Sequence, residues 1–307
     1  AVGKEADKQS VEDIRKIVKG ANMVFIAAGM GGGTGTGAAP VIAKVCKEEG
    51  ALTVAIVTRP FTFEGKRRIA NSVEGLNELK EEVDSIIIVS NDKLLMMSGN
   101  APIGEAFRES DKVLSQSVKT VVDLILMPAV INLDFADVRN TLKTSGVCLI
   151  GFGMGQGSHK AEEAAQNAVS SPLLEASLNG ARKAIVAVTC GPQVSLYEAQ
   201  ETVTRVIEIA GTNPDIKFGV SINDQLTDQI LVSVIAADFA EEYDFTAVPT
   251  YAKVAPAARE VASDKTRTEN AAILKPTEPT HNEDKVPPME DDEANILPDF
   301  LKNQRFQ

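Results

Sequence analysis

Basic residues are scarce in this sequence relative to acidic ones. The 307 residues include 31 lysines and arginines against 43 aspartates and glutamates, which gives a net charge of −12. Proteins that hold nucleic-acid phosphates, and proteins that bind membrane surfaces through polybasic patches, need the opposite balance. The composition therefore argues against nucleic-acid binding and against direct membrane binding.

Cysteine and histidine are also few, and neither is arranged for metal binding. Cys46, Cys148 and Cys190 lie far apart and outside any paired spacing. This pattern indicates reduced core residues in a cytosolic chain. His159 and His281 are isolated, so we assign them no role.

The sequence has no segment suited to a signal peptide or to a membrane span. Its first twenty residues contain no apolar core of the kind that a signal peptide needs. Residues 20–43 carry no charge, but seven of them are glycine, and such a backbone is unsuited to lipid. We therefore expect a cytoplasmic protein.

Glycine is absent from the C-terminal part of the chain. All 22 glycines lie at or before Gly219, whereas 7 of the 14 prolines lie at or after Pro249. Periodic apolar patterns also end near residue 246, so residues 246–293 are predicted to be a disordered linker. Residues 294–307 are apolar again and predict a docking peptide that folds on binding, with a frayed terminus as the alternative.

The first 245 residues alternate between apolar runs and amphipathic stretches. The predicted strands are residues 22–28, 52–58, 85–90, 147–152, 184–189, 216–221 and 230–236. The predicted helices are residues 4–19, 38–49, 66–83, 103–127, 134–145, 160–169 and 196–210. Strand–helix–strand order predicts a parallel sheet, and the two consecutive strands at the end predict a mixed one. The long helix at 103–127 is interpreted as a spine between two domains.

The most informative motif is a glycine-rich loop between the first strand and the next helix. Its residues are Gly31, Gly32, Gly33, Thr34, Gly35, Thr36 and Gly37. Backbone N–H groups of such a loop, together with a helix N-terminus, form an anion site that suits phosphate. A flexible glycine turn is the structural alternative.

The loop departs from two common nucleotide motifs. A Walker A loop requires Gly-Lys-Ser/Thr, but Gly37 is followed by Ala38. Gly33, Gly35 and Ala38 fit a loose dinucleotide pattern, yet the next strand ends in Thr58-Arg59-Pro60 rather than in an acidic residue. A nucleotide phosphate site of another type is favoured, and a dinucleotide-dependent oxidoreductase is the alternative.

Several motifs together resemble one family. They are the loop at 31–37, the segments 59–68, 91–95 and 132–137, and the C-terminal peptide. In this order they resemble the tubulin/FtsZ family of GTPases, and its bacterial cell-division branch more closely than tubulin. The resemblance covers nearly all of residues 1–240 and the last dozen residues.

The resemblance implies an α/β fold with two domains. Residues 1–127 would be a parallel-sheet GTP-binding domain that includes the long central helix, and residues 128–245 an α+β C-terminal activation domain with a mixed sheet. In the family a strand and another glycine-rich loop, which covers the phosphates, come first. The chain begins after them, so we expect an N-terminal truncation. A nucleotide-binding interaction protein that does not hydrolyse is therefore a second alternative.

The resemblance also implies a function. It implies GTP and GDP as ligands with Mg²⁺ on the phosphates, head-to-tail filaments of the chain with itself, and a place in the division ring at mid-cell. Residues 294–307 would engage membrane-tethering and regulatory division proteins, without direct membrane insertion.

Candidate base and ribose contacts lie in three segments. Phe107 and Asp111 are four residues apart and share a helix face, where a ring can stack on guanine and a carboxylate can accept from its N1–H and 2-amino groups. Spacing alone favours a core phenylalanine and a solvated aspartate, but the resemblance assigns them to guanine. It also assigns Glu64, Arg68 and Asn91 to ribose and base, although Glu64 and Arg68 alone would be an ordinary surface pair.

Asn132, Asp134 and Asp137 form the third candidate group. Spacing alone favours a structural use, with Asp134 as a helix N-cap and Asp137 as the third helical residue. The alternative is a carboxylate pair that polarises a water for attack on a γ-phosphate. In the family this loop reaches the nucleotide of the neighbouring subunit, so the resemblance implies catalysis between subunits.

Overall fold

The computed structural model describes residues 10–98, 102–127, 129–174, 180–211 and 214–240, with residues 243 and 245. The linker and docking peptide predicted after residue 245 lie outside these residues.

The first half of the chain forms α2 (Val11–Val18), β1 (Met23–Gly29), α3 (Thr34–Glu48), β2 (Leu52–Arg59), η1 (Thr62–Glu64), α4 (Lys66–Glu82), β3 (Ser85–Ser90), α5 (Asn91–Ser98) and α6 (Ile103–Leu126). The second half forms α7 (Phe135–Leu142), β4 (Gly146–Gln156), α8 (Lys160–Val169), β5 (Ala181–Cys190), α9 (Leu196–Ala210), β6 (Asp215–Ile222), η2 (Asp224–Leu226) and β7 (Gln229–Phe239).

The strands of the described residues form one mixed sheet in the order β1-β2-β3-β4-β7-β5-β6. Each neighbouring pair from β1 to β4 is parallel, and β5 pairs with β6 in parallel as well. β7 runs antiparallel to both of its neighbours, β4 and β5. The predicted α/β fold with a mixed sheet is therefore confirmed. The predicted domain boundary at residue 127 stays a prediction.

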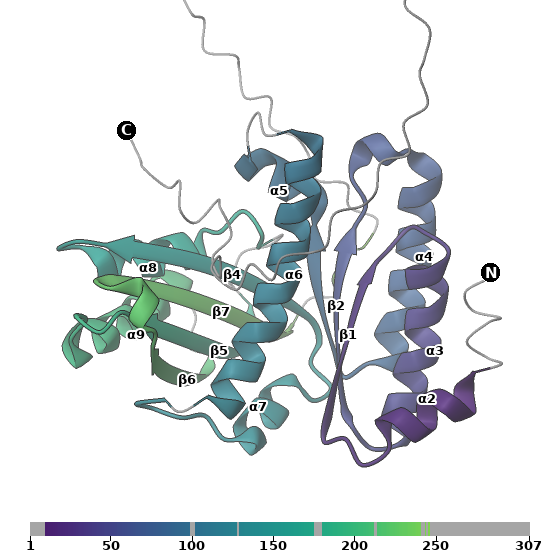
Figure 1. Ribbon diagram of the computed structural model, residues 1–307, viewed down its shortest axis with the longest axis horizontal. Helices are drawn as coiled ribbons and strands as arrows, with labels where there is room; N and C mark the ends of the chain where they lie inside the picture. The colour runs from purple at the N-terminus through teal and green to yellow at the C-terminus, as the bar shows by residue number, and fades with distance from the viewer. Residues whose placement is uncertain are drawn as a thin grey trace, which may run out of the picture. The chain divides into compact units, whose positions relative to one another are not determined.

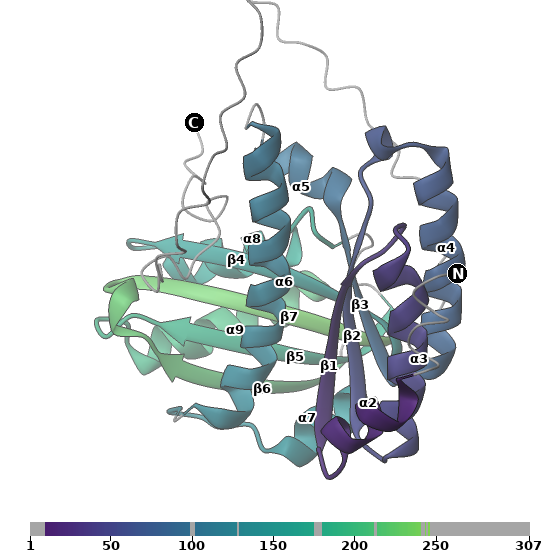
Figure 2. The same cartoon turned by 45° about the vertical axis from the view of Figure 1, so that its right-hand side comes forward.

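The two faces of the sheet are covered by different helices. α3 and α4 pack against β1–β3, and α8 and α9 pack against β4–β7, each pair over a core of its own. α6 lies on the opposite face, between the two groups of strands (Figure 1, Figure 2). The core on that face joins both groups, because Val54 of β2 and Val89 of β3 share it with Ile235 of β7 and Val121 of α6. The predicted long helix thus packs against both halves of the sheet.

Several helices differ from the predictions, and α7 ends at Leu142 rather than at residue 145. α3 begins at Thr34 rather than at residue 38, because Gly37 N already donates to Gly33 O and starts the helical ladder. Pro40 consequently lies in the second turn, although its missing N–H suits the first turn best. α5 was not predicted, because its eight residues show no clear apolar stripe. Of the helix predicted at 4–19, the described part is α2.

The three cysteines are free and buried, as the sequence predicts. Burial raises the pKa of the Cys148 thiol to about 12 and that of Cys190 to about 11. Both thiols therefore stay protonated at neutral pH, and they behave as small apolar side chains.

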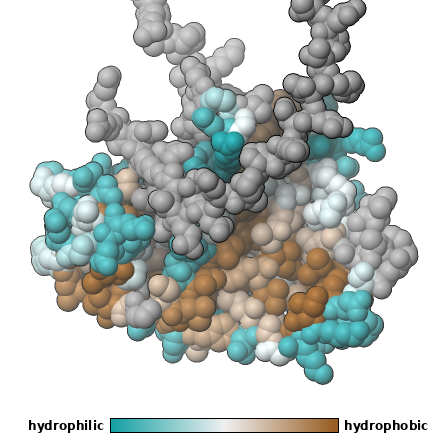
Figure 3. Space-filling view, in the orientation of Figure 1, coloured by the Kyte–Doolittle hydropathy of each residue, from teal (hydrophilic) through white to brown (hydrophobic). Residues whose placement is uncertain are grey.

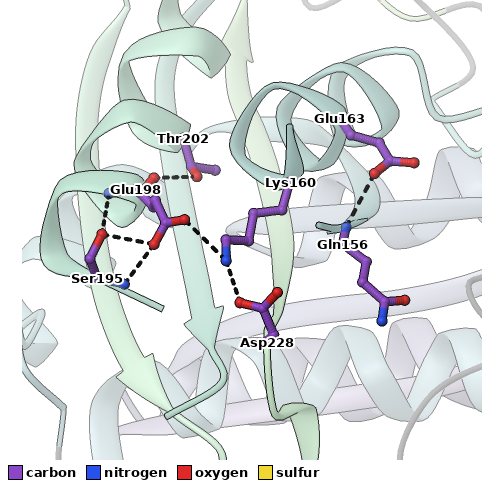
Figure 4. Close-up of polar contacts among 7 residues, drawn as sticks. All are labelled: Gln156, Lys160, Glu163, Ser195, Glu198, Thr202 and Asp228. Atoms are coloured by element: carbon purple, nitrogen blue, oxygen red, sulfur yellow. Dashed lines mark hydrogen bonds and ion pairs between the residues drawn. The ribbon is translucent and has the colours of Figure 1, made fainter. Parts of the chain in front are cut away.

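A buried lysine connects α8, α9 and the segment before β7. The ammonium of Lys160, the first residue of α8, pairs with Asp228 before β7 and lies 3.0 Å from Glu198 Oε1 on α9 (Figure 4). Glu198 also accepts from Ser195 N at 2.8 Å and closes the capping box of α9. Hydrogen bonds from Ser195, and to a smaller extent from Lys160, lower the pKa of Glu198. The hydrogen bond between Lys160 and Asp228 raises the pKa of Lys160.

We expect Lys160→Met to destabilise the fold by about 2 kcal/mol at pH 7, because it removes two charge-assisted bonds from a buried site. A carboxyl with a lowered pKa contributes stability above its ordinary pKa of about 4.3 and loses this contribution as the pH falls. The difference between wild type and variant in urea unfolding should therefore shrink from pH 7 to pH 3.5. Arg205→Met is the matched control, since Arg205 pairs with Glu208 at the surface. Equal losses in both variants would contradict the role given to Lys160.

Candidate nucleotide site

The glycine-rich loop lies at the carboxyl end of the parallel strands, where β1 leads into α3 (Figure 1). Gly32, Gly33 and Thr34 are exposed, and a Cβ added to Gly32 or Gly33 would meet nothing within 4 Å. The first N–H groups of α3 have no partner within the helix. The loop therefore presents an open, positively polarised backbone that an anion can approach.

The buried side of the loop is packed tightly. Gly31 has φ +99°, and its N–H donates to Thr36 Oγ1 at 2.8 Å. A Cβ on Gly35 would lie 2.4 Å from Gly29 O. Gly75 of α4 also permits close approach, since its Cβ would lie 2.3 Å from Thr36 Cγ2. Sequence reasoning missed Gly75, whose only signal is an isolated glycine inside a helix.

Three phenylalanines from the segment after β2 and from α6 pack together. Phe61 is buried and stacks on Phe63, with ring centroids 4.9 Å apart. The ring of Phe107, near the start of α6, makes a T-shaped contact with Phe61 at the same centroid distance. Phe107 remains 42% exposed. It is therefore only partly a core residue, and it retains accessible ring surface.

The predicted ribose and base contacts are placed around these rings. Glu64 of η1 pairs with Arg68 of α4, and its Oε1 accepts from Phe61 N at 2.9 Å. Asn91 is buried, and its Oδ1 accepts from Ser110 Oγ at 2.8 Å. Asp111 is exposed on α6, one turn beyond Phe107. The structure thus brings these residues to the same end of the sheet as the glycine loop, and their roles stay predictions.

Sequence reasoning also missed Asp92, which follows Asn91 directly. Its buried carboxylate accepts from Thr62 N at 2.9 Å and from Thr62 Oγ1 at 2.6 Å. Thr62 lies in the turn that carries Phe61, Phe63 and Glu64. No local signal reveals this contact, because its partners are thirty residues apart.

The candidate catalytic residues lie at the opposite end of the sheet. Asp134 is the N-cap of α7, and its Oδ1 accepts from Asp137 N at 2.7 Å, which is the structural use that the spacing favours. Asn132 Oδ1 accepts from Ala129 N at 3.0 Å. The segment after α7 is fixed beside the amino end of β3, where Ser145 N donates to Asp84 O at 3.0 Å. Figure 1 shows α7 at the lower end and the loop before α3 at the upper end.

Comparison with known families matches both halves of the chain. Residues 1–99 match the GTPase domain of the Tubulin/FtsZ family, and residues 146–240 match the C-terminal domain of the FtsZ family. An FtsZ from M. jannaschii, solved as an empty dimer, has 39% sequence identity and a TM-score of 0.75 over 80% of this chain and 71% of that chain. The chain belongs to the FtsZ family.

Two further solved structures are similar to this FtsZ-family chain. A point mutant of FtsZ from M. jannaschii has 39% identity and a TM-score of 0.76, over 80% of this chain and 74% of that chain. The GDP-bound monomer of CetZ1 from Haloferax volcanii has 18% identity and a TM-score of 0.64, over 76% of this chain and 72% of that one. The likeness to CetZ1 concerns the fold alone.

Membership defines the general activity. FtsZ-family proteins bind GTP and GDP and hydrolyse GTP, so this chain is an FtsZ-like cytoskeletal GTPase. None of the helices in the described part of the chain has an apolar stretch of the length that a membrane span needs. The same part of the chain holds no group of three histidine, cysteine or acidic side chains that could bind a metal ion.

Proposed function

We propose that the glycine loop binds the phosphates of GTP and that the adjoining segments bind its nucleoside. The backbone of residues 31–37 and the hydroxyl of the exposed Thr34 would donate to the phosphates. Phe107 would stack on the base and Asp111 would accept from its N1–H and 2-amino groups, which adenine cannot match. Glu64 of η1, Arg68 of α4 and Asn91, which directly follows β3, would hold the ribose and the base.

Hydrolysis would be completed by the next subunit in a head-to-tail filament. The observation that carries this proposal is the position of α7, whose N-cap is Asp134 and whose first turn holds Asp137, at the end of the sheet away from the loop before α3 (Figure 1). Within one subunit they are far from the γ-phosphate. When subunits stack with one end on the other, the α7 end of one meets the loop end of the next, and such a contact repeats without closing.

Exposed apolar side chains at the α7 end support such a contact. Leu126, Met127 and Val130 are 73%, 55% and 55% exposed at the end of α6 and in the segment that follows. Val130 is fixed there, because its N–H donates to Val220 O on β6 at 2.8 Å. Apolar side chains also gather over the lower part of α6 and over β1 in Figure 3. Exposed apolar residues of this kind mark sites of protein association.

Mg²⁺ would accompany the nucleotide. This ion keeps several waters and takes ligands mainly from the phosphates, with few from the protein. Thr34, on the open side of the loop, fits this mode because it offers a hydroxyl oxygen. When bound, the ion would neutralise phosphate charge. Asp134 and Asp137 of the next subunit, with Asn132 in the same loop, would polarise the attacking water.

The cellular role follows from assembly. We infer that the filaments contribute to the division ring at mid-cell. Residues 294–307, which lie outside the described residues, would connect them to membrane-tethering and regulatory division proteins through the linker at 246–293.

The test combines light scattering with phosphate release after GTP is added to the full chain. Scattering should rise only with GTP, and turnover per subunit should increase with protein concentration, because each site is completed by a neighbour. Turnover that is independent of concentration would contradict hydrolysis between subunits. Binding without scattering or phosphate release would favour the interaction protein that does not hydrolyse.

A further inference from the structure

Asp92 directly follows Asn91 of the proposed nucleotide site, and it is almost completely buried. It is 4% exposed, and Thr62 donates to both of its oxygens, through N at 2.9 Å and through Oγ1 at 2.6 Å. Burial of a charge costs free energy unless hydrogen bonds compensate it. A buried carboxylate with two such donors therefore fixes the position of its partner.

The partner of Asp92 lies at the centre of the segment that precedes α4. Thr62 is flanked by Phe61 and Phe63, whose rings stack, and Phe61 also contacts Phe107. The same turn is closed by Glu64, which accepts from Phe61 N. The position of Thr62 thus determines where the Glu64 carboxylate and the two rings stand.

The residue before Asp92 is tied to a second element of the site. Asn91 accepts from Ser110 on α6, the helix that carries Phe107 and Asp111. The junction of β3 and α5 therefore contacts both the Thr62 turn and α6. Two consecutive side chains set the spacing between the elements that would hold the ribose and the base.

We propose that Asp92 is a positioning residue for guanine nucleotide, which it would influence through Thr62 without touching the ligand. This inference rests on the proposed nucleotide site. Without the anchor, the turn would sample several conformations, and binding would have to select the competent one. The apparent affinity falls by the fraction of molecules that are competent.

The test uses conservative variants at both ends of the contact. Thr62→Val removes the hydroxyl at nearly constant shape, Thr62→Ser keeps it, and Asp92→Asn removes the charge. Affinity for a fluorescent GDP analogue should fall about tenfold in Thr62→Val and in Asp92→Asn, and stay within about twofold of wild type in Thr62→Ser. The double variant Thr62→Val/Asp92→Asn should bind no more weakly than the weaker single variant.

Asp84 provides a matched control at the other end of the sheet. It is also buried, and its Oδ2 accepts from Thr53 N at 2.9 Å. Asp84→Asn should lower the urea midpoint as Asp92→Asn does and leave affinity unchanged. Wild-type affinity in Asp92→Asn and Thr62→Val, or an equal loss of affinity in Asp84→Asn, would overturn the proposal.

Hydrogen exchange separates this inference from the proposed function. If the wild-type chain bound no guanine nucleotide, the proposed site would fail, but anchoring would still predict faster amide exchange at residues 61–65 in Asp92→Asn than in Asp84→Asn. Equal exchange in the two variants would overturn the positioning role in either case.

Discussion

Replacement of Asp137 by asparagine should lower GTP turnover by about 100-fold or more, because a positioned general base contributes that much to a proton transfer. Nucleotide affinity should stay within about twofold of wild type, since Asp137 lies at the opposite end of the sheet from the loop. Affinity is measured with a fluorescent GDP analogue, and turnover by phosphate release at concentrations that support assembly. Asp137→Asn keeps the size of the side chain. It also keeps the cap of α7, because Asp134 Oδ1 accepts from the backbone N–H of residue 137.

Two further variants make this test specific. Asp134→Asn removes a charge but keeps the N-cap, since asparagine caps helices as well as aspartate does. A turnover loss in this variant would therefore report on the charge and not on the fold of α7. Asp224→Asn, at an exposed position in η2, is the neutral control.

Mixing provides the decisive measurement for catalysis between subunits. A subunit with Asp137→Asn still binds GTP, and a subunit with Gly33→Ala, which should bind it poorly, still carries Asp137. Random pairing of equal amounts places an intact Asp137 against a bound nucleotide at about a quarter of the junctions. Turnover should recover accordingly. Filaments that contain both variants but recover no turnover would contradict the assignment, as would unchanged turnover in Asp137→Asn alone.

Replacement of Gly35 by alanine should destabilise the fold by about 3 kcal/mol, because the new Cβ would lie 2.4 Å from Gly29 O, and overpacking against a fixed backbone is costly. The sign of the change in stability distinguishes overpacking from the ordinary effect of this substitution. Alanine in place of a helical glycine ordinarily stabilises a protein by up to about 1 kcal/mol. Urea unfolding of the variant and of wild type measures the difference.

Two other glycines separate packing from ligand binding. Gly104, in the first turn of α6, has open space around it, so Gly104→Ala should be neutral or stabilising. Gly33→Ala should also fold normally, because nothing lies within 4 Å of its added Cβ and its φ is −85°. Its nucleotide affinity should nevertheless fall at least about tenfold, as the methyl group blocks close approach of phosphate. Normal affinity in Gly33→Ala would contradict phosphate binding at this loop.

Most of the fold follows from local patterns in the sequence. β2 and β3 are mostly apolar and show no alternation of polar and apolar residues, and both are fully buried. α9 begins and ends at the predicted residues, because Ser195 and Glu198 form a capping box and Gly211 adopts the left-handed conformation that ends a helix. The first turn of α3 was not predicted, since its glycines and threonines favour a loop and the turn is supported by packing against Gly75.

In the candidate site, too, some features follow from local spacing and others depend on contacts between distant residues. The shared helix face of Phe107 and Asp111, and the cap formed by Asp134, follow from spacings of three or four residues. The contacts of Thr62 with Asp92 and of Asn91 with Ser110 join residues 30 and 19 positions apart. Such contacts depend on the register of parallel strands, which composition and periodicity do not determine.

The placement of β7 has a consequence for synthesis of the chain. It is the last strand of the described residues, yet it is inserted between β4 and β5, which do not pair with each other. Until the ribosome has released residues 229–239, both of these strands keep an unpaired edge of backbone N–H and C=O groups. Unpaired edges recruit other strands, and contacts between distant segments form slowly. The nascent protein is therefore most prone to aggregation just before its last strand emerges, and chaperones would be needed most at that point.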